Sequence, residues 1–199
     1  MSTAAVSTRP GVLADRLVRR SSVLTDLALV LSGTVVVALL AQVTIPLWPV
    51  PITGQTLAVM VVGGALGLRR GAAALSTYLL AGLAGLPVFA GGLAGPAYLL
   101  SPTFGFILGF IGAAALAGWA AERAWDRNVV LAMIGFGLAT VVPFVFGVPW
   151  MAAVLGMSDP AQILAAGVTP FIVPGLIKAG IAAVAFPLVW QFVRHVDTK

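Results

Sequence analysis

Lys178 is the residue of this sequence with the clearest chemical meaning, because it lies inside an otherwise apolar run that covers residues 169–187. A lone ammonium group in hydrocarbon costs roughly 2.5–3.5 kcal/mol on insertion scales, so it needs a partner, a water-filled cavity or a route to the interface. We expect no aspartate or glutamate within a membrane span to neutralise it. The predicted partner is therefore an anionic ligand; the alternative is a lysine whose stem reaches the interface without a binding role.

A small number of other polar groups are available to complete a site around this lysine. Apolar walls with few polar groups are typical of small-molecule sites. Each candidate also has a structural interpretation, since a threonine can cap a helix and a tyrosine can anchor a protein at the membrane interface. The candidates are Thr53, Gln55, Tyr78, Ser101 and Thr103.

The composition is that of an integral membrane protein. Of the 199 residues, 60% are hydrophobic and only 9% are charged, and the mean hydropathy is +1.09. A soluble domain carries about 25% charged residues. The apolar runs are continuous rather than alternating, which argues against a transmembrane β-barrel. The absence of cysteine excludes disulfides and thiolate metal sites.

We expect an all-α membrane domain of six transmembrane helices at residues 23–193, between cytoplasmic tails at 1–22 and 194–199. Three prolines at residues 46–51 end the first helix. The apolar segment 86–103 contains three prolines and three glycines, and such backbone is tolerated at membrane depth only where protein or a cavity covers it. The segment 86–103 is therefore expected to fold back over a binding pocket. Further along the chain, a short helix is expected at 160–166. The predicted spans are 24–45, 55–68, 71–86, 104–121, 129–148 and 169–192.

The basic residues predict the orientation of these helices. All nine arginines fall in the two tails or in the turns at 69–70 and 123–127, and Lys199 joins them. With six spans, these four places lie on one side of the membrane, and the other three connections contain no lysine or arginine. The positive-inside rule then places both termini in the cytoplasm. Because topology explains the arginines, nucleic-acid binding is not predicted.

Small residues at four-residue spacing allow helices to approach closely. The strongest series lies in span 104–121 and is expected to pack inside the six-helix body: Gly105, Gly109, Ala113, Ala117 and Ala121. Span 24–45 offers two weaker pairs, Ala28 with Ser32 and Gly33 with Ala41.

An enzyme is not predicted, and neither a cofactor nor a metal is expected. The only histidine is His195, in the C-terminal tail, and no paired carboxylates are expected within the spans. The phosphate-binding motif G-x-x-x-x-G-K-[ST] is missing from the sequence, so any ATP hydrolysis belongs to another chain. A proton- or sodium-coupled transporter stays open as an alternative, although such coupling usually uses intramembrane carboxylates.

Three motifs carry a family resemblance: VPITGQTL at residues 50–57, GLAGLPVFAGG at 82–92 and SPTFGF at 101–106. In sequence, order and spacing they resemble the biotin-transporter S components (BioY), over about residues 39–186. The resemblance implies the vitamin-capture subunit of an energy-coupling-factor transporter, which binds biotin from outside. Its implied partners are membrane lipid, a transmembrane coupling protein and ABC-type ATPase subunits. Another small anionic vitamin is the alternative ligand.

The resemblance also implies where the ligand and the partners bind. In the family's last helix an acidic residue usually stands three positions before the lysine; here that position is Gly175. The first span, with Ala28, Ser32, Gly33 and Ala41, is the expected face for the coupling protein. The expected substrate-binding residues are Lys178, Gln55, Thr53, Tyr78, Phe89, Gly91, Gly92 and Thr103.

Overall fold

The computed structural model describes residues 11–18 and 22–197 and is almost entirely helical. The strands form one short antiparallel hairpin, in which Thr44 pairs with Thr53 and Ile45 with Ile52. The elements, in chain order, are α1 (Leu13–Leu17), α2 (Val23–Ala41), β1 (Thr44–Ile45), β2 (Ile52–Thr53), α3 (Gln55–Leu66), α4 (Leu68–Leu83), η1 (Ala90–Gly92), η2 (Pro96–Leu100), α5 (Phe104–Ala121), η3 (Trp125–Arg127), α6 (Val129–Leu155), α7 (Pro160–Gly167) and α8 (Thr169–Asp197).

Four helical segments of the described chain are long and apolar enough to cross a membrane: Val23–Ala41, Phe104–Ala121, Val129–Leu155 and Pro160–His195. The helix α3 is apolar but has only 12 residues, and α4 has 16. A helix of about 20 residues is needed to cross the hydrocarbon core without tilting or local thinning of the bilayer. The all-helical membrane fold is thus confirmed, whereas the count of six spans stays a prediction.

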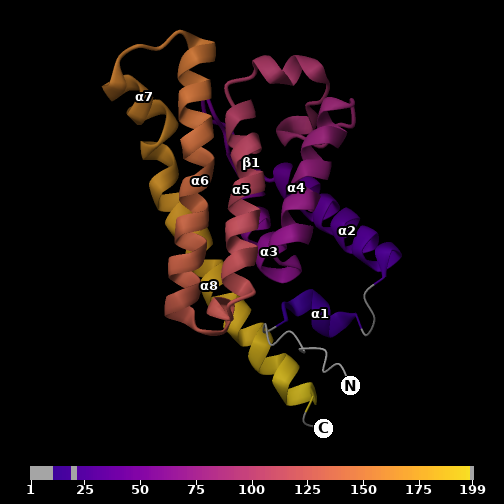
Figure 1. Ribbon diagram of the computed structural model, residues 1–199. Helices are drawn as coiled ribbons and strands as arrows, with labels where there is room; N and C mark the ends of the chain where they lie inside the picture. The colour runs from indigo at the N-terminus through magenta and orange to yellow at the C-terminus, as the bar shows by residue number, and fades with distance from the viewer. Residues whose placement is uncertain (1–10, 19–21, 198–199) are drawn as a thin grey trace, which may run out of the picture.

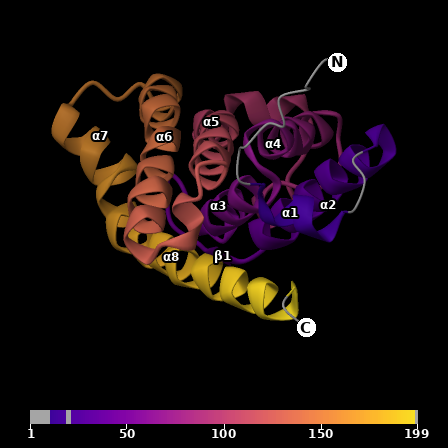
Figure 2. The same ribbon diagram turned by 60° about the horizontal axis from the view of Figure 1, so that its bottom comes forward.

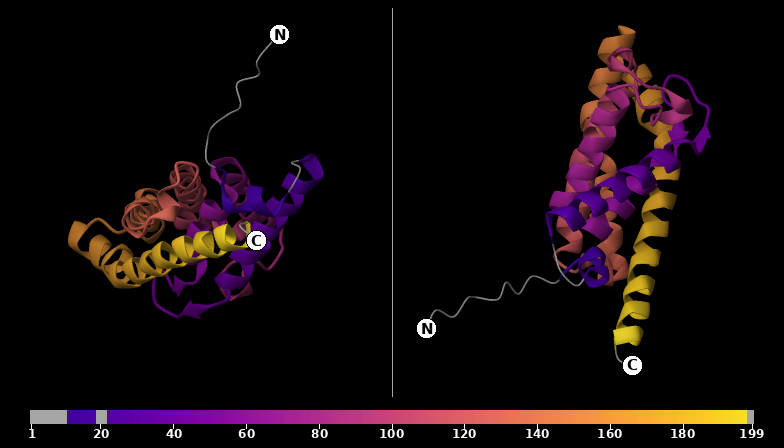
Figure 3. Two further views of the ribbon diagram at one scale, coloured as in Figure 1. Left: turned by 90° about the horizontal axis from the view of Figure 1, so that it is seen from below. Right: turned by 90° about the vertical axis from the view of Figure 1, so that its right-hand side faces the viewer.

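The helices form a bundle in which α5 is central and packs against α3, α4 and α6 (Figure 1). The helices α2 and α7 lie at opposite edges of the molecule, as Figure 2 also shows. Seen from below, α5 and α6 are viewed nearly along their axes, while α8 runs obliquely across the bundle (Figure 3). The helix α1 and the C-terminal end of α8 lie at the same end of the molecule.

The small residues of α5 are buried against neighbouring helices, as predicted. A Cβ added to Gly109 would lie 2.6 Å from the Cα of Pro143 in α6, and one added to Gly105 would lie 2.7 Å from the Phe146 carbonyl oxygen. On another side of α5, Gly118 faces Gly67 so closely that a Cβ there would lie 2.3 Å from the Gly67 carbonyl carbon. These glycines therefore let α5 contact helix backbones on two sides.

The helix α6 extends seven residues beyond the predicted end at residue 148, reaching Leu155. Pro149 lies inside the helix, where it removes its own N–H donor, and neighbouring groups in a membrane bundle can compensate for the lost bond. The helix ends instead at Gly156, whose φ of 64° suits glycine and allows its N–H to bond back to the Ala152 carbonyl. The short helix predicted at 160–166 is present as α7.

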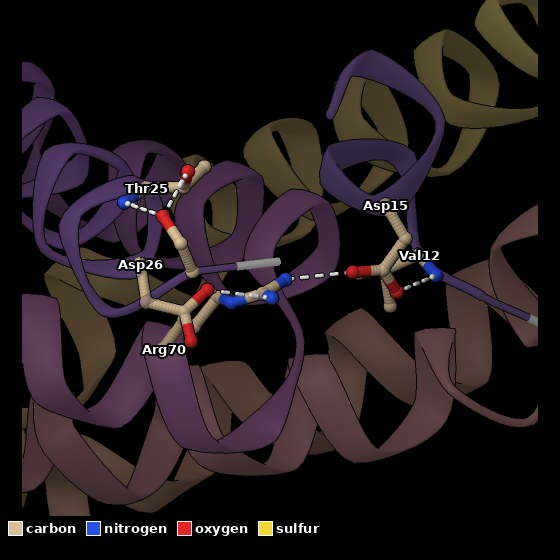
Figure 4. Close-up of polar contacts among 6 residues, drawn as sticks. Val12, Asp15, Thr25, Asp26 and Arg70 are labelled. Carbon is tan, nitrogen blue, oxygen red and sulfur yellow. Dashed lines mark hydrogen bonds and ion pairs between the residues drawn. The ribbon is translucent and has the colours of Figure 1, made fainter. Parts of the chain in front are cut away.

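One end of the molecule carries the described basic segments: α1, the start of α4, η3 and the end of α8 (Figure 1). There Arg70 binds Asp15 of α1 and Asp26 of α2, each at 2.7 Å, as Figure 4 shows. Asp26 lies in the first turn of α2, so the expectation that no carboxylate falls within a span is wrong. Asp26 nevertheless pairs with Arg70 and not with Lys178. It lies in the first turn of α2, at the end of the molecule where Arg70 is found.

The segment 11–17 lies within the expected N-terminal tail, yet Val12, Leu13 and Ala14 pack on the bundle. Val12 and Ala14 are 3% and 2% exposed. The Arg127 guanidinium donates to the Gly11 carbonyl at 2.9 Å, which ties this segment to η3. The helix α1 therefore covers part of the basic end of the bundle.

The close approach of α3 and α5 generates a prediction. A Cβ on Gly63 would lie 2.4 Å from the Ala114 carbonyl oxygen, a backbone atom that cannot rotate away. Gly63→Ala should cost about 1–3 kcal/mol of unfolding free energy and lower the melting temperature by about 3–10 °C. Gly137→Ala is the matched control, since a Cβ there meets nothing within 4 Å. Circular dichroism melting in detergent measures both, and equal melting temperatures would contradict the packing described here.

Candidate ligand-binding site

Lys178 extends from α8 toward the start of α3 and is partly buried. Its ammonium donates to the carbonyl oxygen of Thr53 at 2.6 Å and to the hydroxyl of Thr56 at 2.9 Å. In the described part of the chain no carboxylate pairs with it. Because an ammonium has three N–H donors, one donor and the full positive charge stay available to a ligand.

A chain of buried hydrogen bonds continues from this point into the protein. The Thr53 hydroxyl donates to the Gln55 side-chain oxygen at 2.7 Å, and the Gln55 amide donates to the Tyr78 hydroxyl at 2.7 Å. Tyr78 in turn donates to the Val88 carbonyl at 3.0 Å. The sequence folds this way because Gly54 permits a close turn, a Cβ there lying 2.6 Å from the Leu40 carbonyl oxygen. Polar contacts thus link Lys178 and Gln55 to the segment 86–103.

A second polar cluster lies where η2 leads into α5. The hydroxyls of Tyr98 and Thr103 are 2.7 Å apart, and those of Ser101 and Thr103 are 2.8 Å apart. The indole of Trp150 donates to the Ser101 carbonyl at 3.2 Å, which fixes the cluster against α6. These hydroxyls are neutral groups that both donate and accept.

Both polar clusters border one pocket near the end of the molecule opposite α1. The pocket holds about 640 Å³ of space outside protein atoms, its open mouth included. Its walls are mainly apolar, with Lys178 as the one charged residue among them. The lining residues are Val50, Pro51, Thr53, Gln55, Thr56, Ala90, Tyr98, Thr103, Phe106, Ile107, Phe110, Thr140, Pro143, Phe144, Phe171, Pro174, Gly175 and Lys178.

The pocket brings together half of the expected substrate-binding residues. Lys178, Gln55, Thr53 and Thr103 line it, although they come from α8, α3, β2 and the residue just before α5. Ser101 lies behind Thr103 and contributes through its hydrogen bond. The last helix, the hairpin β1–β2 and the segment 86–103 therefore converge on one cavity.

The other four expected residues do not line the pocket. Tyr78 and Phe89 are fully buried at 0% exposure, and Phe89 packs between the rings of Tyr78 and Tyr98. Gly91 and Gly92 are exposed, with φ angles of 71° and 72° that favour glycine. These residues shape the loop beside the pocket, and Ala90 is the member of that loop that borders the cavity.

Sequence reasoning missed several residues that line the pocket. Tyr98 had a detectable signal, as one of two tyrosines, placed in the irregular segment expected to cover the pocket. Phe144 and Phe171 gave no such signal, because the sequence of an apolar helix does not indicate which side an aromatic residue faces. Gly175 lines the pocket beside Thr140, where a Cβ would lie 3.1 Å from the threonine methyl group. The position of the family's acidic residue is therefore part of the cavity wall here.

The four residues expected at the partner face divide into two pairs. Ala28 and Ser32 are exposed on α2. Gly33 and Ala41 are buried, and a Cβ on Gly33 would lie 2.9 Å from Leu66 and 3.1 Å from Ala74. Gly33 and Ala41 therefore pack α2 on α3 and α4, and the structure leaves only the first pair accessible.

Comparison with known proteins places this architecture in a family. The BioY family profile matches residues 11–195. The chain belongs to the BioY family. A biotin transporter BioY of Rhizobium etli is 38% identical over 156 residues, which cover 75% of this chain and 82% of that protein. Biotin transporter BioY2 of Lactococcus lactis is 34% identical, over 77% of this chain and 84% of that protein.

The fold is also similar to a crystal structure described as the S-component for biotin from an ECF-type ABC transporter. The TM-score is 0.73 at 24% sequence identity, and the match covers 84% of this chain and 92% of that one. At this identity the likeness shows a shared fold. The BioY helical architecture is therefore common to both chains.

Proposed function

We propose that this chain is a biotin-capturing S component of an energy-coupling-factor transporter. The observation that carries the proposal is one ammonium group, Lys178, in the wall of an apolar pocket within a BioY-family fold. Two BioY-family relatives are named biotin transporters, and each matches more than 80% of its own length to this chain. The pocket, the fold and the relatives support the same role.

The chemistry of biotin is compatible with the pocket. Biotin has one carboxylate, an apolar ring and chain, and a ureido group that both donates and accepts hydrogen bonds. The Lys178 ammonium is the proposed partner of the carboxylate, since a charge-assisted hydrogen bond is stronger than a neutral one. Phe106, Phe144 and Phe171 provide apolar surface for the rest of the molecule.

We infer that the chain does not supply the energy for uptake. It has no phosphate-binding loop of the type G-x-x-x-x-G-K-[ST]. A protein that binds its substrate without an energy source can equilibrate the substrate but not concentrate it. A transmembrane coupling protein and ABC-type ATPase subunits are the proposed partners, and the exposed pair Ala28 and Ser32 on α2 is the proposed contact face.

We further propose six membrane spans with both termini in the cytoplasm. The helices α3 and α4 would supply the second and third spans, packed inside the bundle where short helices are shielded by their neighbours. The clustering of the described basic segments at one end supports this orientation through the positive-inside rule. The pocket would then open to the outside.

The role of Lys178 is tested by Lys178→Met, which keeps the length and the apolar stem while removing the charge. We expect biotin binding to weaken by about 2–5 kcal/mol, because the carboxylate would lose its partner in a dry pocket. Isothermal titration calorimetry in detergent measures the change. Biotin amide is the control ligand and should lose far less affinity. Equal losses for the acid and the amide would show that Lys178 is structural, and a wild-type protein that binds no biotin would refute the proposed function.

The energy requirement is tested in proteoliposomes that contain the purified chain alone. They should bind labelled biotin but should not accumulate it above the outside free concentration, with or without imposed ion gradients. Gradient-dependent accumulation would favour an ion-coupled transporter over the partner-dependent one. Addition of a coupling protein with its ATPases and ATP should then permit accumulation.

The topology is tested with single cysteines, which the cysteine-free chain permits. Ala97 in η2 and Arg123 after α5 are both exposed. In intact cells, Ala97→Cys should react with an impermeant thiol reagent and Arg123→Cys should react only after the membrane is opened. Labelling of Arg123→Cys from outside would overturn the proposed orientation.

A further inference from the structure

Gln42 lies directly after the last residue of α2, where the chain leaves the helix and enters the hairpin β1–β2. Its side chain reaches a segment far away in the sequence. The amide nitrogen donates to the Phe89 carbonyl at 3.1 Å and lies 3.4 Å from the Val88 carbonyl; it also donates to the Ala38 carbonyl of its own helix at 3.1 Å. The side-chain oxygen accepts from the Gly92 N–H at 3.1 Å. One amide group thus satisfies both donors and acceptors of residues 88–92.

The segment 88–92 is held by bonds within its own backbone and by side chains from outside. The Phe89 N–H donates to the Leu93 carbonyl at 3.1 Å, and the Gly92 N–H lies 3.0 Å from the Phe89 carbonyl as well as bonding to Gln42. The segment contains Gly91 and Gly92, both with positive φ, and glycine loses more conformational freedom on ordering than any other residue. Phe89 anchors it from one side, with its ring against Gly82. Among the described residues, Gln42 and Tyr78 are the side chains from elsewhere in the chain that bond to its backbone. Of these two side chains, Gln42 is the one that bonds to the backbone of Gly92.

The same residue adjoins the second loop of the pocket. Val43 follows it and accepts a hydrogen bond from the Gly54 N–H at 2.8 Å, which closes the base of the hairpin. The hairpin carries Val50, Pro51 and Thr53 into the pocket wall, while the segment 88–92 contributes Ala90. Gln42 therefore connects the two loops that border the cavity on this side.

We infer that Gln42 is a positioning residue that holds the segment 88–92 against the hairpin and so slows the escape of bound ligand. The inference rests on the proposed function for its ligand, biotin. A ligand enclosed by two loops leaves when the loops separate, so loss of the link accelerates dissociation. Affinity differences between related complexes arise mostly in the dissociation rate.

The test replaces Gln42 by methionine, which has a similar length but no amide. The biotin dissociation rate of Gln42→Met, followed by stopped-flow mixing, should rise about 5- to 20-fold, because two to three partly exposed hydrogen bonds are lost. The association rate should stay within about two-fold of wild type. The melting temperature of the ligand-free protein should not change, since Gln42 lies on the surface. Gln162→Met is the matched control, because Gln162 in α7 is exposed and makes no side-chain hydrogen bond among the described residues.

Hydrogen–deuterium exchange supplies a readout that needs no ligand. The Gly92 amide hydrogen should exchange faster in Gln42→Met than in wild type, and at the wild-type rate in Gln162→Met. If the wild-type protein binds no biotin, the proposed function fails while the exchange result still tests the contact. The inference would be overturned if, in Gln42→Met, the Gly92 amide exchange rate and the biotin dissociation rate were both the same as in wild type. A parallel loss of melting temperature and association rate would also overturn it, because Gln42 would then serve folding alone.

Discussion

The placement of one ammonium group in an apolar bundle is the constraint on which the pocket depends. Lys178 is held by the Thr53 carbonyl and the Thr56 hydroxyl, which are dipoles and leave its charge uncompensated. The Thr53 carbonyl and the Thr56 hydroxyl lie at the start of α3. The close turn at Gly54 lets the end of the hairpin bring Thr53 to Lys178 of α8. A carboxylate beside Lys178 would have satisfied the charge internally and removed the preference for an anion. The position of Gly175 in the pocket wall is consistent with a site that leaves this charge to the ligand.

The bundle gains its close packing from backbone contact, which leaves large side chains free for the pocket. Gly63, Gly109 and Gly118 bring α5 against its neighbours at distances that no side chain tolerates. In a membrane, where apolar side chains gain little by leaving lipid, such backbone contact is a main source of helix association. The aromatic residues that do not fill these contacts, Phe106 and Phe144 among them, then border the cavity.

The irregular connections depend on a few polar side chains for their shape. Tyr78 of α4 and Gln42, directly after α2, bond to the backbone of the segment 88–92. Backbone groups that are shielded from water must find partners. In this segment the partners are other backbone groups, such as the Leu93 carbonyl that accepts from the Phe89 N–H at 3.1 Å, together with these two side chains. Tyr78 lies behind the pocket rather than in its wall, so its contribution to the site is to fix the loop through the Val88 carbonyl.

From the sequence alone came the membrane class, the bounds of α5, the presence of α7 and the internal packing of the small residues in α5, together with the prediction that Lys178 is the centre of a site. Each of these follows from composition or from spacing along one helix, which are local properties. Tertiary structure decided which polar residues converge, since the contact of Lys178 with Thr53 joins positions 125 residues apart. It also decided that Gly33 and Ala41 are buried while Ala28 and Ser32 are exposed, because a small residue looks the same in sequence whichever neighbour it faces. The continuation of α6 past Pro149 was decided in the same way, since surrounding groups and not the proline alone determine where a membrane helix ends.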